Sequence, residues 1–291
     1  MTDAPSGAAG IVDAHHHLWV RARHPQPWID PVTMAAIDAD FELVDLAPLA
    51  RAVGVTATVV VQSIASVRET ADLLRVAAAD ALVSGVVGWV DLTADDIADR
   101  LDRLRAGPGG QYLVGIRHLV QSETDPAYLD RPDVRRGIAA VGAAGLVFDL
   151  LVRQHQLPMA ARLAHHLPEV RFVLDHLGKP ALGSPEFHDW RRGLRALAEA
   201  PNTTAKVSGL TTEVPGSPWT VADLRPAVDH ALAVFGPQRL MFGSDWPVSL
   251  LATSYPRWVE AVTELLAELD PTDRAAVWAD TARRHYRLEA S

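Results

Sequence analysis

The sequence lacks cysteine, a long apolar run and any cluster of basic residues. None of its 291 residues is cysteine, which excludes disulfides, thiolate metal ligands and a cysteine nucleophile. The longest apolar stretch, Val141 to Val152, is interrupted by Asp149 and is shorter than the roughly 20 residues that span a bilayer. A formal net charge of −9 disfavours binding to a polyphosphate backbone. These absences argue against a membrane protein and against a nucleic-acid partner.

The opening segment, Met1 to Gly10, is small and polar, with neither a basic start nor an apolar stretch. A secretory signal normally has both features. We therefore expect a flexible N-terminal tail over residues 1–10 and a cytoplasmic protein.

Short apolar runs rich in β-forming residues recur eight times along the chain. They are Ile11–Ala14, Ala57–Gln62, Val83–Asp91, Leu113–Val120, Gly145–Val152, Arg171–Asp175, Thr203–Val207 and Leu240–Gly243. Amphipathic stretches with helical periodicity fit between most of them, for example Arg68–Ala79, Ile97–Leu104, Met159–His166, Trp190–Glu199 and Pro226–Phe235. Apolar strands that alternate with helices indicate a parallel sheet covered on both faces. Eight such strands predict a (β/α)8 TIM barrel.

Composition and missing motifs favour this barrel over other arrangements. A chain of this length, 48% hydrophobic, could form one large α/β barrel or two smaller domains. No linker or charge block marks a boundary, so we expect residues 1–291 to form a single domain. No G-x-G-x-x-G or G-x-x-x-x-G-K-[ST] motif follows a strand, as in nucleotide-binding open sheets. The Pro-rich segment Arg21 to Asp45 is expected to form a long loop over the active face.

Polar or ionisable residues occur where most of these strands end. Catalytic groups in (β/α)8 barrels lie at these positions. The candidates are His15, His17, Gln62, Asp91, Arg117, His118, Asp149, His176, Lys206 and Asp245. Closure of the barrel would place His15, His17 and Asp245 in one site. Strand ends are often polar because they approach water, so the residue types carry more weight than the positions.

Two histidines of the first strand have the spacing of a metal-binding pair. His15 and His17 are two residues apart, so on a strand their side chains leave the same face, about 6.5–7 Å apart along the chain. Two imidazoles placed in this way can bind one ion, whereas His16 would point toward the helices. The alternative, an affinity-tag remnant or a solvated loop, conflicts with the apolar flanks of the run. His176, taken alone, is more often structural.

Five motifs occur in a fixed order along the chain. They are Asp-x-His-x-His near the N-terminus, Gly-Ile-Arg-His at 115–118, Leu-Asp-His-Leu-Gly-Lys-Pro at 174–180, Lys-Val-Ser-Gly-Leu at 206–210 and Phe-Gly-Ser-Asp-Trp-Pro at 242–247. Together they resemble the amidohydrolase superfamily, and within it the lactonase branch related to L-fuconolactonase, L-rhamnono-lactonase and 2-pyrone-4,6-dicarboxylate lactonase. The resemblance extends from Ile11 to about Tyr286.

The resemblance implies a metal site. His15 and His17 match the first-strand histidine pair, His176 the sixth-strand histidine and Asp245 the eighth-strand aspartate. These residues would bind at most one divalent ion, because the fourth strand ends in Arg117 and not in the carboxylated lysine of two-metal members. Imidazole and carboxylate ligands suit Zn²⁺ best, with Mn²⁺ as the competitor. Some related lactonases work without a metal, so the ion could be dispensable.

A lactone is a cyclic ester, and its hydrolysis needs an activated water, a stabilised oxyanion and a proton for the leaving alkoxide. We assign Asp245 as the base that takes and later returns the proton; the alternative for Asp245 is a helix N-cap. His176 could donate a hydrogen bond to the oxyanion. Arg117 could polarise or anchor the substrate, or it could form a structural ion pair with Asp91 or Asp149.

Further residues are candidates for substrate binding. Lys206 could approach the substrate or only balance nearby carboxylates, and tryptophans near strand ends could stack on a sugar ring or pack in the core. The full set of substrate-binding candidates is Gln62, Arg117, His118, Asp149, Lys206, Trp19 and Trp246. The sequence does not decide the roles of Asp91, His155 and Gln156.

These residues predict a hydrolase that opens a small lactone, with a sugar-acid lactone as the favoured substrate. The alternatives are a metal-dependent decarboxylase of the same superfamily, a dicarboxylate lactonase and a barrel that only binds its ligand. A dicarboxylate would require several clustered arginines, whereas only Arg117 is placed at a strand end. The stereochemistry and ring size of the lactone, and whether the protein is a monomer or a homo-oligomer, stay open.

Overall fold

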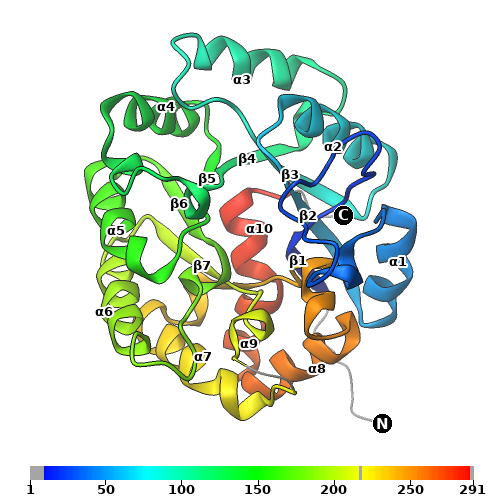
Figure 1. The fold of residues 1–291 in the computed structure, drawn as a ribbon, viewed down its shortest axis with the longest axis vertical. Helices are drawn as coiled ribbons and strands as arrows, with labels where there is room; N and C mark the ends of the chain where they lie inside the picture. The colour runs from blue at the N-terminus through cyan, green and yellow to red at the C-terminus, as the bar shows by residue number, and fades with distance from the viewer. Residues whose placement is uncertain (1–9, 216–217, 289–291) are drawn as a thin grey trace.

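Eight parallel strands follow one another around a barrel in the computed structural model, which describes residues 10–215 and 218–288 (Figure 1). The strands are β1 (Ile11–His16), β2 (Val55–Val61), β3 (Val83–Gly88), β4 (Leu113–His118), β5 (Val147–Leu150), β6 (Arg171–Leu174), β7 (Thr203–Val207) and β8 (Leu240–Phe242). Each strand pairs in parallel with the next along the chain. The predicted (β/α)8 barrel is confirmed. The expected tail, residues 1–10, lies outside the described residues except for Gly10.

A helix follows each strand and covers the outside of the barrel (Figure 1). These helices are α1 (Leu43–Ala52), α2 (Val67–Ala79), α3 (Ile97–Ala106), α4 (Pro132–Ala143), α5 (Leu157–His166), α6 (Phe187–Ala198), α7 (Val221–Phe235) and α8 (Tyr255–Leu265). The five helices expected from periodicity correspond to α2, α3, α5, α6 and α7. Within the described residues, no helix is both long and apolar enough to cross a bilayer.

The segment expected to be a long loop, Arg21 to Asp45, overlaps the start of a helix. Helix α1 begins at Leu43, where the backbone N–H of Glu42 donates to the Asp45 carboxylate in a capping box. Pro48 lies inside α1 and conceals the helical pattern in the sequence. The remainder of the segment is irregular apart from a 3₁₀ turn at Ala35–Ile37, as predicted.

The C-terminal segment closes one end of the barrel. It comprises α9 (Pro271–Ala275), a π-helical turn (Ala276–Asp280) and α10 (Thr281–Tyr286), and α10 crosses the centre of the view in Figure 1. Tyr286 and Leu288 pack among the inward-facing valines of the strands. Arg171, the first residue of β6, donates to the carbonyl of His285. Because α10 covers the end where strands begin, the carboxyl ends of the strands remain for a site.

The first and last strands are joined by the loop that follows β8. The backbone N–H of Asp245 donates to the His15 carbonyl at 2.7 Å, and the N–H of His17 donates to the Trp246 carbonyl at 2.7 Å. The N–H of Ser244 donates to the Asp13 carboxylate at 2.8 Å. These bonds close the barrel and bring both ends of the sequence to the same place.

Asp13 is a fully buried carboxylate at this closure. Besides Ser244, it accepts from the backbone N–H of His15 at 3.2 Å and from the hydroxyl of Tyr255 at 2.9 Å. Burial raises the pKa of Asp13 to about 6, although the hydrogen bonds from Ser244, His15 and Tyr255 oppose the rise. The carboxylate therefore depends on its donors to remain ionised.

We expect Tyr255→Phe to lower the free energy of unfolding by about 1.5–3 kcal/mol, the range for a hydrogen bond to a charged group. The variant leaves one buried oxygen of Asp13 without its hydroxyl donor. Urea unfolding measures the change. Tyr112→Phe is the matched control, because Tyr112 is only half-buried and its hydroxyl makes no hydrogen bond among the described residues. Equal stability of Tyr255→Phe and the wild type would contradict the prediction.

Candidate active site

Three imidazoles converge on the carboxylate of Asp245 at the carboxyl ends of the strands. The Oδ1 atom of Asp245 lies 3.5 Å from Nε2 of His17, 3.7 Å from Nε2 of His15 and 3.9 Å from Nε2 of His176. The Nε2 atoms of His15 and His17 are 3.2 Å apart. All four residues are at most 5% exposed. The structure thus brings together the residues that the sequence singled out as a metal and catalytic set.

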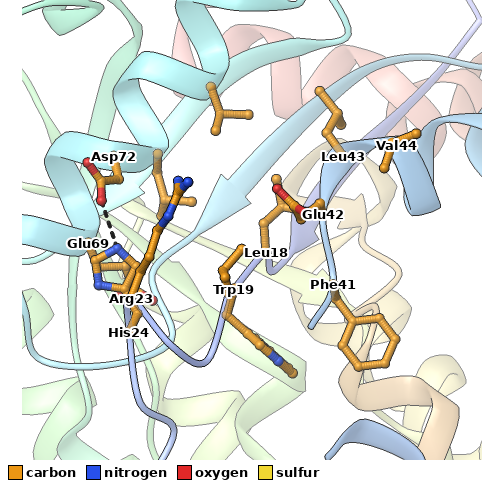
Figure 2. A pocket seen from close by; sticks show the side chains of 13 residues that line it. Leu18, Trp19, Arg23, His24, Phe41, Glu42, Leu43, Val44, Glu69 and Asp72 are labelled. Carbon is orange, nitrogen blue, oxygen red and sulfur yellow. Dashed lines mark hydrogen bonds and ion pairs between the residues drawn. The ribbon is translucent and has the colours of Figure 1, made fainter. Parts of the chain in front are cut away.

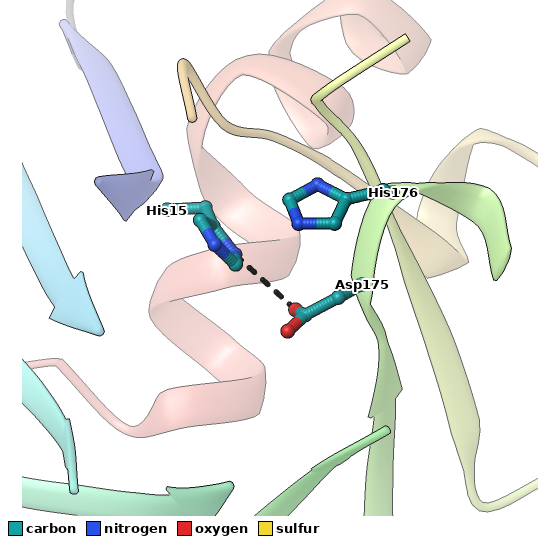
Figure 3. A group of neighbouring side chains, drawn as sticks. All are labelled: His15, Asp175 and His176. Carbon is teal, nitrogen blue, oxygen red and sulfur yellow. Dashed lines mark ion pairs between the residues drawn. The ribbon is translucent and has the colours of Figure 1, made fainter. Parts of the chain in front are cut away.

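The donor set fits a single divalent ion. Two bonds of about 2.0–2.1 Å at a tetrahedral angle separate ligand atoms by roughly 3.3–3.4 Å. The separations among His15, His17 and Asp245, from 3.2 to 3.7 Å, lie close to that value. A second group, His15, Asp175 and His176, also places three ligand atoms near one another (Figure 3). His15 belongs to both groups.

The Nδ1 atoms of His17 and His176, which lie opposite the converging Nε2 atoms, form hydrogen bonds with protein groups. Nδ1 of His17 lies 2.7 Å from the carbonyl oxygen of Val61, to which it must donate, so Nε2 is the nitrogen of His17 that is left to bind a metal. Nδ1 of His176 lies 2.9 Å from the hydroxyl of Ser208. Such outer contacts orient metal-binding imidazoles and set their tautomers.

The electrostatics favour an ionised Asp245 beside neutral His15 and His176, because burial lowers the pKa of both imidazoles. Burial by itself would raise the pKa of Asp245, but the interactions with His176, His17 and His15 outweigh burial and hold the pKa well below its usual range. Burial lowers the pKa of His176 to about 4, against the attraction of Asp245 and Asp175. At neutral pH the site therefore presents one carboxylate that can accept a proton or bind a cation.

His176 is held by a left-handed turn. His176, Leu177, Gly178 and Lys179 all have positive φ angles, from 50° to 70°. Left-handed conformation in consecutive non-glycine residues costs energy, and neighbouring contacts offset this cost. The indole N–H of Trp190 donates to the Leu177 carbonyl at 2.7 Å, and the N–H of Lys179 donates to the His176 carbonyl at 2.8 Å. The turn that follows β6 and carries His176 is therefore left-handed.

Beneath the converging histidines lies a buried layer of charges. Nη1 of Arg117 pairs with Asp175 at 3.0 Å. The predicted structural ion pair of Arg117 with Asp91 or Asp149 was therefore wrong. Nζ of Lys206 lies 2.6 Å from Asp149 and 2.9 Å from Asp175. Asp175 was not among the predicted site residues, because the motif that contains it was interpreted through the neighbouring His176. Its position at the end of an apolar strand was the available signal.

Lys206 and Asp149 pair with each other inside the barrel and do not reach solvent. Both are 0% exposed, and the hydroxyl of Tyr286 donates to the same carboxylate of Asp149. Of the two roles considered for Lys206, balancing carboxylates matches the geometry. That Lys206 and Asp149 also contact substrate stays a prediction, which their full burial does not favour.

The remaining candidates from β2 and β4 surround the site. Gln62 is buried; its side-chain N–H donates to the Arg117 carbonyl at 3.1 Å, and its Oε1 has no hydrogen-bond partner among the described residues. His118 receives the indole N–H of Trp89 on Nδ1 at 3.1 Å and contacts Glu123 through Nε2 at 2.6 Å. Both ring nitrogens of His118 are thus engaged.

The two tryptophan candidates pack against one aromatic neighbour. Trp19 and Trp246 are each 2% exposed, and their rings lie edge-on to Phe41 at 5.7 and 5.3 Å. The indole N–H of Trp19 donates to the Ala39 carbonyl. Packing against neighbouring protein groups therefore covers most of the surface of both tryptophan side chains.

The structure also places the residues whose roles the sequence left open. Asp91 accepts from the backbone and hydroxyl of Thr93, Gln156 binds the backbone of Val120 and Arg153, and His155 is exposed. The alternative of a helix N-cap for Asp245 was wrong, because α8 begins later and is capped by Ser254.

A cavity of about 220 Å³ lies beside the site, between the loop after β1, the start of α1 and helix α2 (Figure 2). Its polar side includes the ion pair of His24 with Asp72, whose atoms are 2.9 Å apart. Trp19 lines the cavity, whereas none of the four converging residues does. The cavity is therefore distinct from the candidate active site.

Fold and site together define a parallel-barrel enzyme with histidine and aspartate side chains at the carboxyl ends of its strands. A family model described as amidohydrolase matches residues 12–288. An L-fucono-1,5-lactonase of Burkholderia multivorans is 40% identical, with 95% of this chain and 96% of that protein covered. Another from Burkholderia ambifaria is 37% identical, with 96% of each covered.

A crystal structure of an amidohydrolase from Burkholderia multivorans with bound zinc is also similar. It has a TM-score of 0.90 and 39% identity, covering 97% of this chain and 100% of that chain. The chain belongs to the amidohydrolase family, as its motifs predicted.

Gly209→Ala should disrupt the site without a change in any converging residue. Gly209 has φ +62°, and a Cβ there would lie 2.6 Å from Nδ1 of His176 and 2.9 Å from Oδ2 of Asp245. Displacement of catalytic groups by about 1 Å can cost roughly 100-fold in rate, and we expect a loss of about that size in kcat/KM.

Gly236→Ala is the matched control, since Gly236 has φ +73° but no atom within 4 Å of its Cβ position. It imposes strong backbone strain away from the site, because the φ of 73° and ψ of 156° at Gly236 lie in a region that is almost restricted to glycine. If both variants lose activity equally, backbone strain and not contact with His176 and Asp245 is the cause.

Proposed function

We propose that this amidohydrolase opens the cyclic ester of a sugar-acid lactone of the fucono type. The observation that carries the proposal is the buried, ionised Asp245 with the Nε2 atoms of His15, His17 and His176 within 3.9 Å of Oδ1. Ester hydrolysis by an activated water requires such a base beside groups that can stabilise charge. The two similar proteins described above, at 37% and 40% identity, are L-fucono-1,5-lactonases.

Asp245 acts as the proton shuttle in this reaction. Its carboxylate takes a proton from a water molecule as the water oxygen attacks the lactone carbonyl carbon. When the ring C–O bond breaks, the alkoxide receives that proton from Asp245, which restores the carboxylate. The low pKa of Asp245 keeps the carboxylate ionised and free before each turnover, and it makes the protonated group a strong acid that returns the proton readily to the alkoxide.

In the absence of a metal, His176 and Arg117 stabilise the negative charge that develops on the carbonyl oxygen. When the hydroxyl of Ser208 donates to Nδ1 of His176, Nε2 carries the proton and can donate to an oxyanion. The guanidinium of Arg117 is 2% exposed and lies 3.4 Å from Nε2 of His15. It therefore supplies positive charge from beneath the site and does not anchor the substrate directly.

We assign His15, His17 and Asp245, with His176 beside them, as the residues that hold a divalent metal. Zn²⁺ is the favoured ion and Mn²⁺ the alternative, because the donors are imidazole nitrogens and a carboxylate oxygen. A similar amidohydrolase has zinc bound. When bound, the ion would polarise the carbonyl and lower the pKa of the water.

Four residues are proposed to shape the substrate side of the site. The unpartnered Oε1 of Gln62 can accept a hydrogen bond from a substrate hydroxyl. Although both tryptophans pack against Phe41, the Trp19 ring centroid lies 6.4 Å from that of His17 and Trp246 directly follows Asp245. His118 with its stacked neighbour Tyr128, 4.8 Å away, is proposed to form part of the wall near β4. A polyol ring with both hydroxyls and apolar C–H faces matches such a lining.

The arginine content of the site disfavours a dicarboxylate substrate. Among the described residues, Arg117 is the one arginine within hydrogen-bonding or ion-pairing distance of the converging side chains, and it already pairs with Asp175. A substrate with two carboxylates would leave at least one of them without a cationic partner. A sugar-acid lactone, which is uncharged, requires none.

Acid release from a panel of aldonolactones tests the proposed activity. We expect rapid release, followed with a pH indicator, from fucono-1,5-lactone, and slower release from rhamnono-, arabino- and xylono-lactones. Repeating the assay with a chelator shows whether a metal is needed. No release from any lactone, together with CO₂ release from a carboxylated substrate, would favour the decarboxylase instead.

Asp245→Asn should lower kcat by about 100-fold or more, the usual contribution of a general base. The amide keeps the shape of the side chain, so circular dichroism and unfolding should show an intact fold. Asp72→Asn is the matched control, because it removes one carboxylate charge next to the separate cavity and outside the site. Near-normal kcat in Asp245→Asn would exclude Asp245 as the shuttle.

A further inference from the structure

Glu69 is a buried carboxylate outside the set of converging side chains. It lies in the first turn of α2, three residues after the helix cap Ser66, and is 1% exposed. A Ser-x-x-Glu sequence at this position usually forms a capping box, in which the glutamate accepts from the backbone N–H of the serine. Here that N–H donates to the Ile64 carbonyl at 2.9 Å. The carboxylate of Glu69 is therefore available to other donors.

The carboxylate binds the loop that follows β2. Its Oε2 atom accepts from the backbone N–H groups of Ser63 and Ile64, each at 3.1 Å, and its Oε1 atom accepts from the hydroxyl of Ser63. Burial raises the pKa of Glu69, and the hydrogen bonds from Ser63 and Ile64 oppose that rise. Hydrogen bonds to an ionised acceptor are the strong ones. Glu69 thus fixes the backbone at the start of this loop.

The peptide unit that joins Gln62 to Ser63 is held on both sides. Its N–H belongs to Ser63 and donates to Glu69. Its carbonyl belongs to Gln62 and accepts from Nη2 of Arg117. Because a peptide unit is planar and rigid, the bond to Glu69 on one side sets the direction of the carbonyl on the other.

A second contact ties the same residue to Arg117. The side-chain N–H of Gln62 donates to the Arg117 carbonyl at 3.1 Å, so Gln62 and Arg117 bind each other reciprocally although β3 lies between their strands. Nη1 of Arg117 pairs with Asp175 at 3.0 Å and lies 3.4 Å from Nε2 of His15. The Gln62 carbonyl and Asp175 together decide where the guanidinium lies.

We propose that Glu69 is a positioning residue, which holds the guanidinium of Arg117 beneath the site through the Gln62–Ser63 peptide. The inference rests on the proposed function, in which Arg117 supplies positive charge to the developing oxyanion. Glu69 also lines the separate cavity (Figure 2). Both of its oxygens already accept from the loop, so its charge serves the loop and not a ligand in that cavity.

Glu69→Met tests the proposal, because it removes both acceptors and keeps the length of the side chain. We expect kcat for fucono-1,5-lactone to fall about 10-fold, less than the roughly 100-fold cost of a 1 Å misplacement. KM should stay nearly constant, since Arg117 acts on charge that appears only in the transition state. Glu69→Gln retains one oxygen without the charge, and we expect a smaller loss of about 3-fold.

A double-mutant cycle separates positioning from general stability. Arg117→Lys keeps a cation opposite Asp175 but removes the Nη2 donor to the Gln62 carbonyl. In that background, Glu69→Met should lower kcat by less than about 2-fold, because coupled residues are not additive. An undiminished further loss would overturn the proposal, and so would wild-type kcat in both Glu69 variants.

Ser66→Ala is the matched control in the same helical turn. It removes the hydroxyl that accepts from the Glu69 N–H and weakens the helix cap, but it leaves the bonds of the Gln62–Ser63 peptide in place. We expect near-normal kcat. A loss equal to that of Glu69→Met would assign the effect to the helix and overturn the positioning role.

Amide hydrogen exchange gives a measurement that needs neither lactone nor metal. In Glu69→Met, the amides of Ser63 and Ile64 should exchange about 10-fold faster than in the wild type, because they lose their acceptor. Unchanged exchange would overturn the proposal. A wild type that opens no lactone would contradict the proposed function, whereas an active wild type matched by its Glu69 variants would contradict only the role of Glu69.

Discussion

The hydrogen bonds between β1 and the loop after β8 are the constraint on which the site depends. They join residues more than 220 positions apart in the chain through the backbones of His15, His17, Asp245 and Trp246. The β8 strand itself is only three residues long, so closure relies on this loop. His15, His17 and Asp245, the candidate metal ligands, belong to the segments that form these bonds. Closure of the barrel therefore also assembles the site.

A second constraint is charge balance in the barrel interior. Arg117 and Lys206 bring two cations into contact with Asp149 and Asp175, all of them at most 2% exposed. Burial opposes each charge on its own, and pairing offsets that penalty only when every partner is present. The layer therefore orients the groups above it, and Arg117 and Lys206 act on the site through His15 without a direct path to solvent.

Much of this arrangement was predictable from local patterns. The eight apolar runs marked the strands within a few residues, and His15, His17, His176 and Asp245 were recognisable as residues at strand ends. The helix at Leu43–Ala52 was not expected, because an internal Pro48 interrupts its periodicity. The predicted ion-pair partner of Arg117 was also wrong. Several strands end in an acidic residue, and spacing along the chain does not show which of them lies next to Arg117.

Sequence by itself determined the barrel class and the residue types at its open end, because strand and helix periodicities are local properties of the chain. Tertiary structure alone decided that Asp175 and not Asp149 neutralises Arg117, that Lys206 is buried against His15, and that His176 lies in a left-handed turn. These features depend on distances of a few ångströms between residues on different strands. Such distances follow from the stagger and closure of the whole barrel. No single segment of the sequence contains the information that sets them.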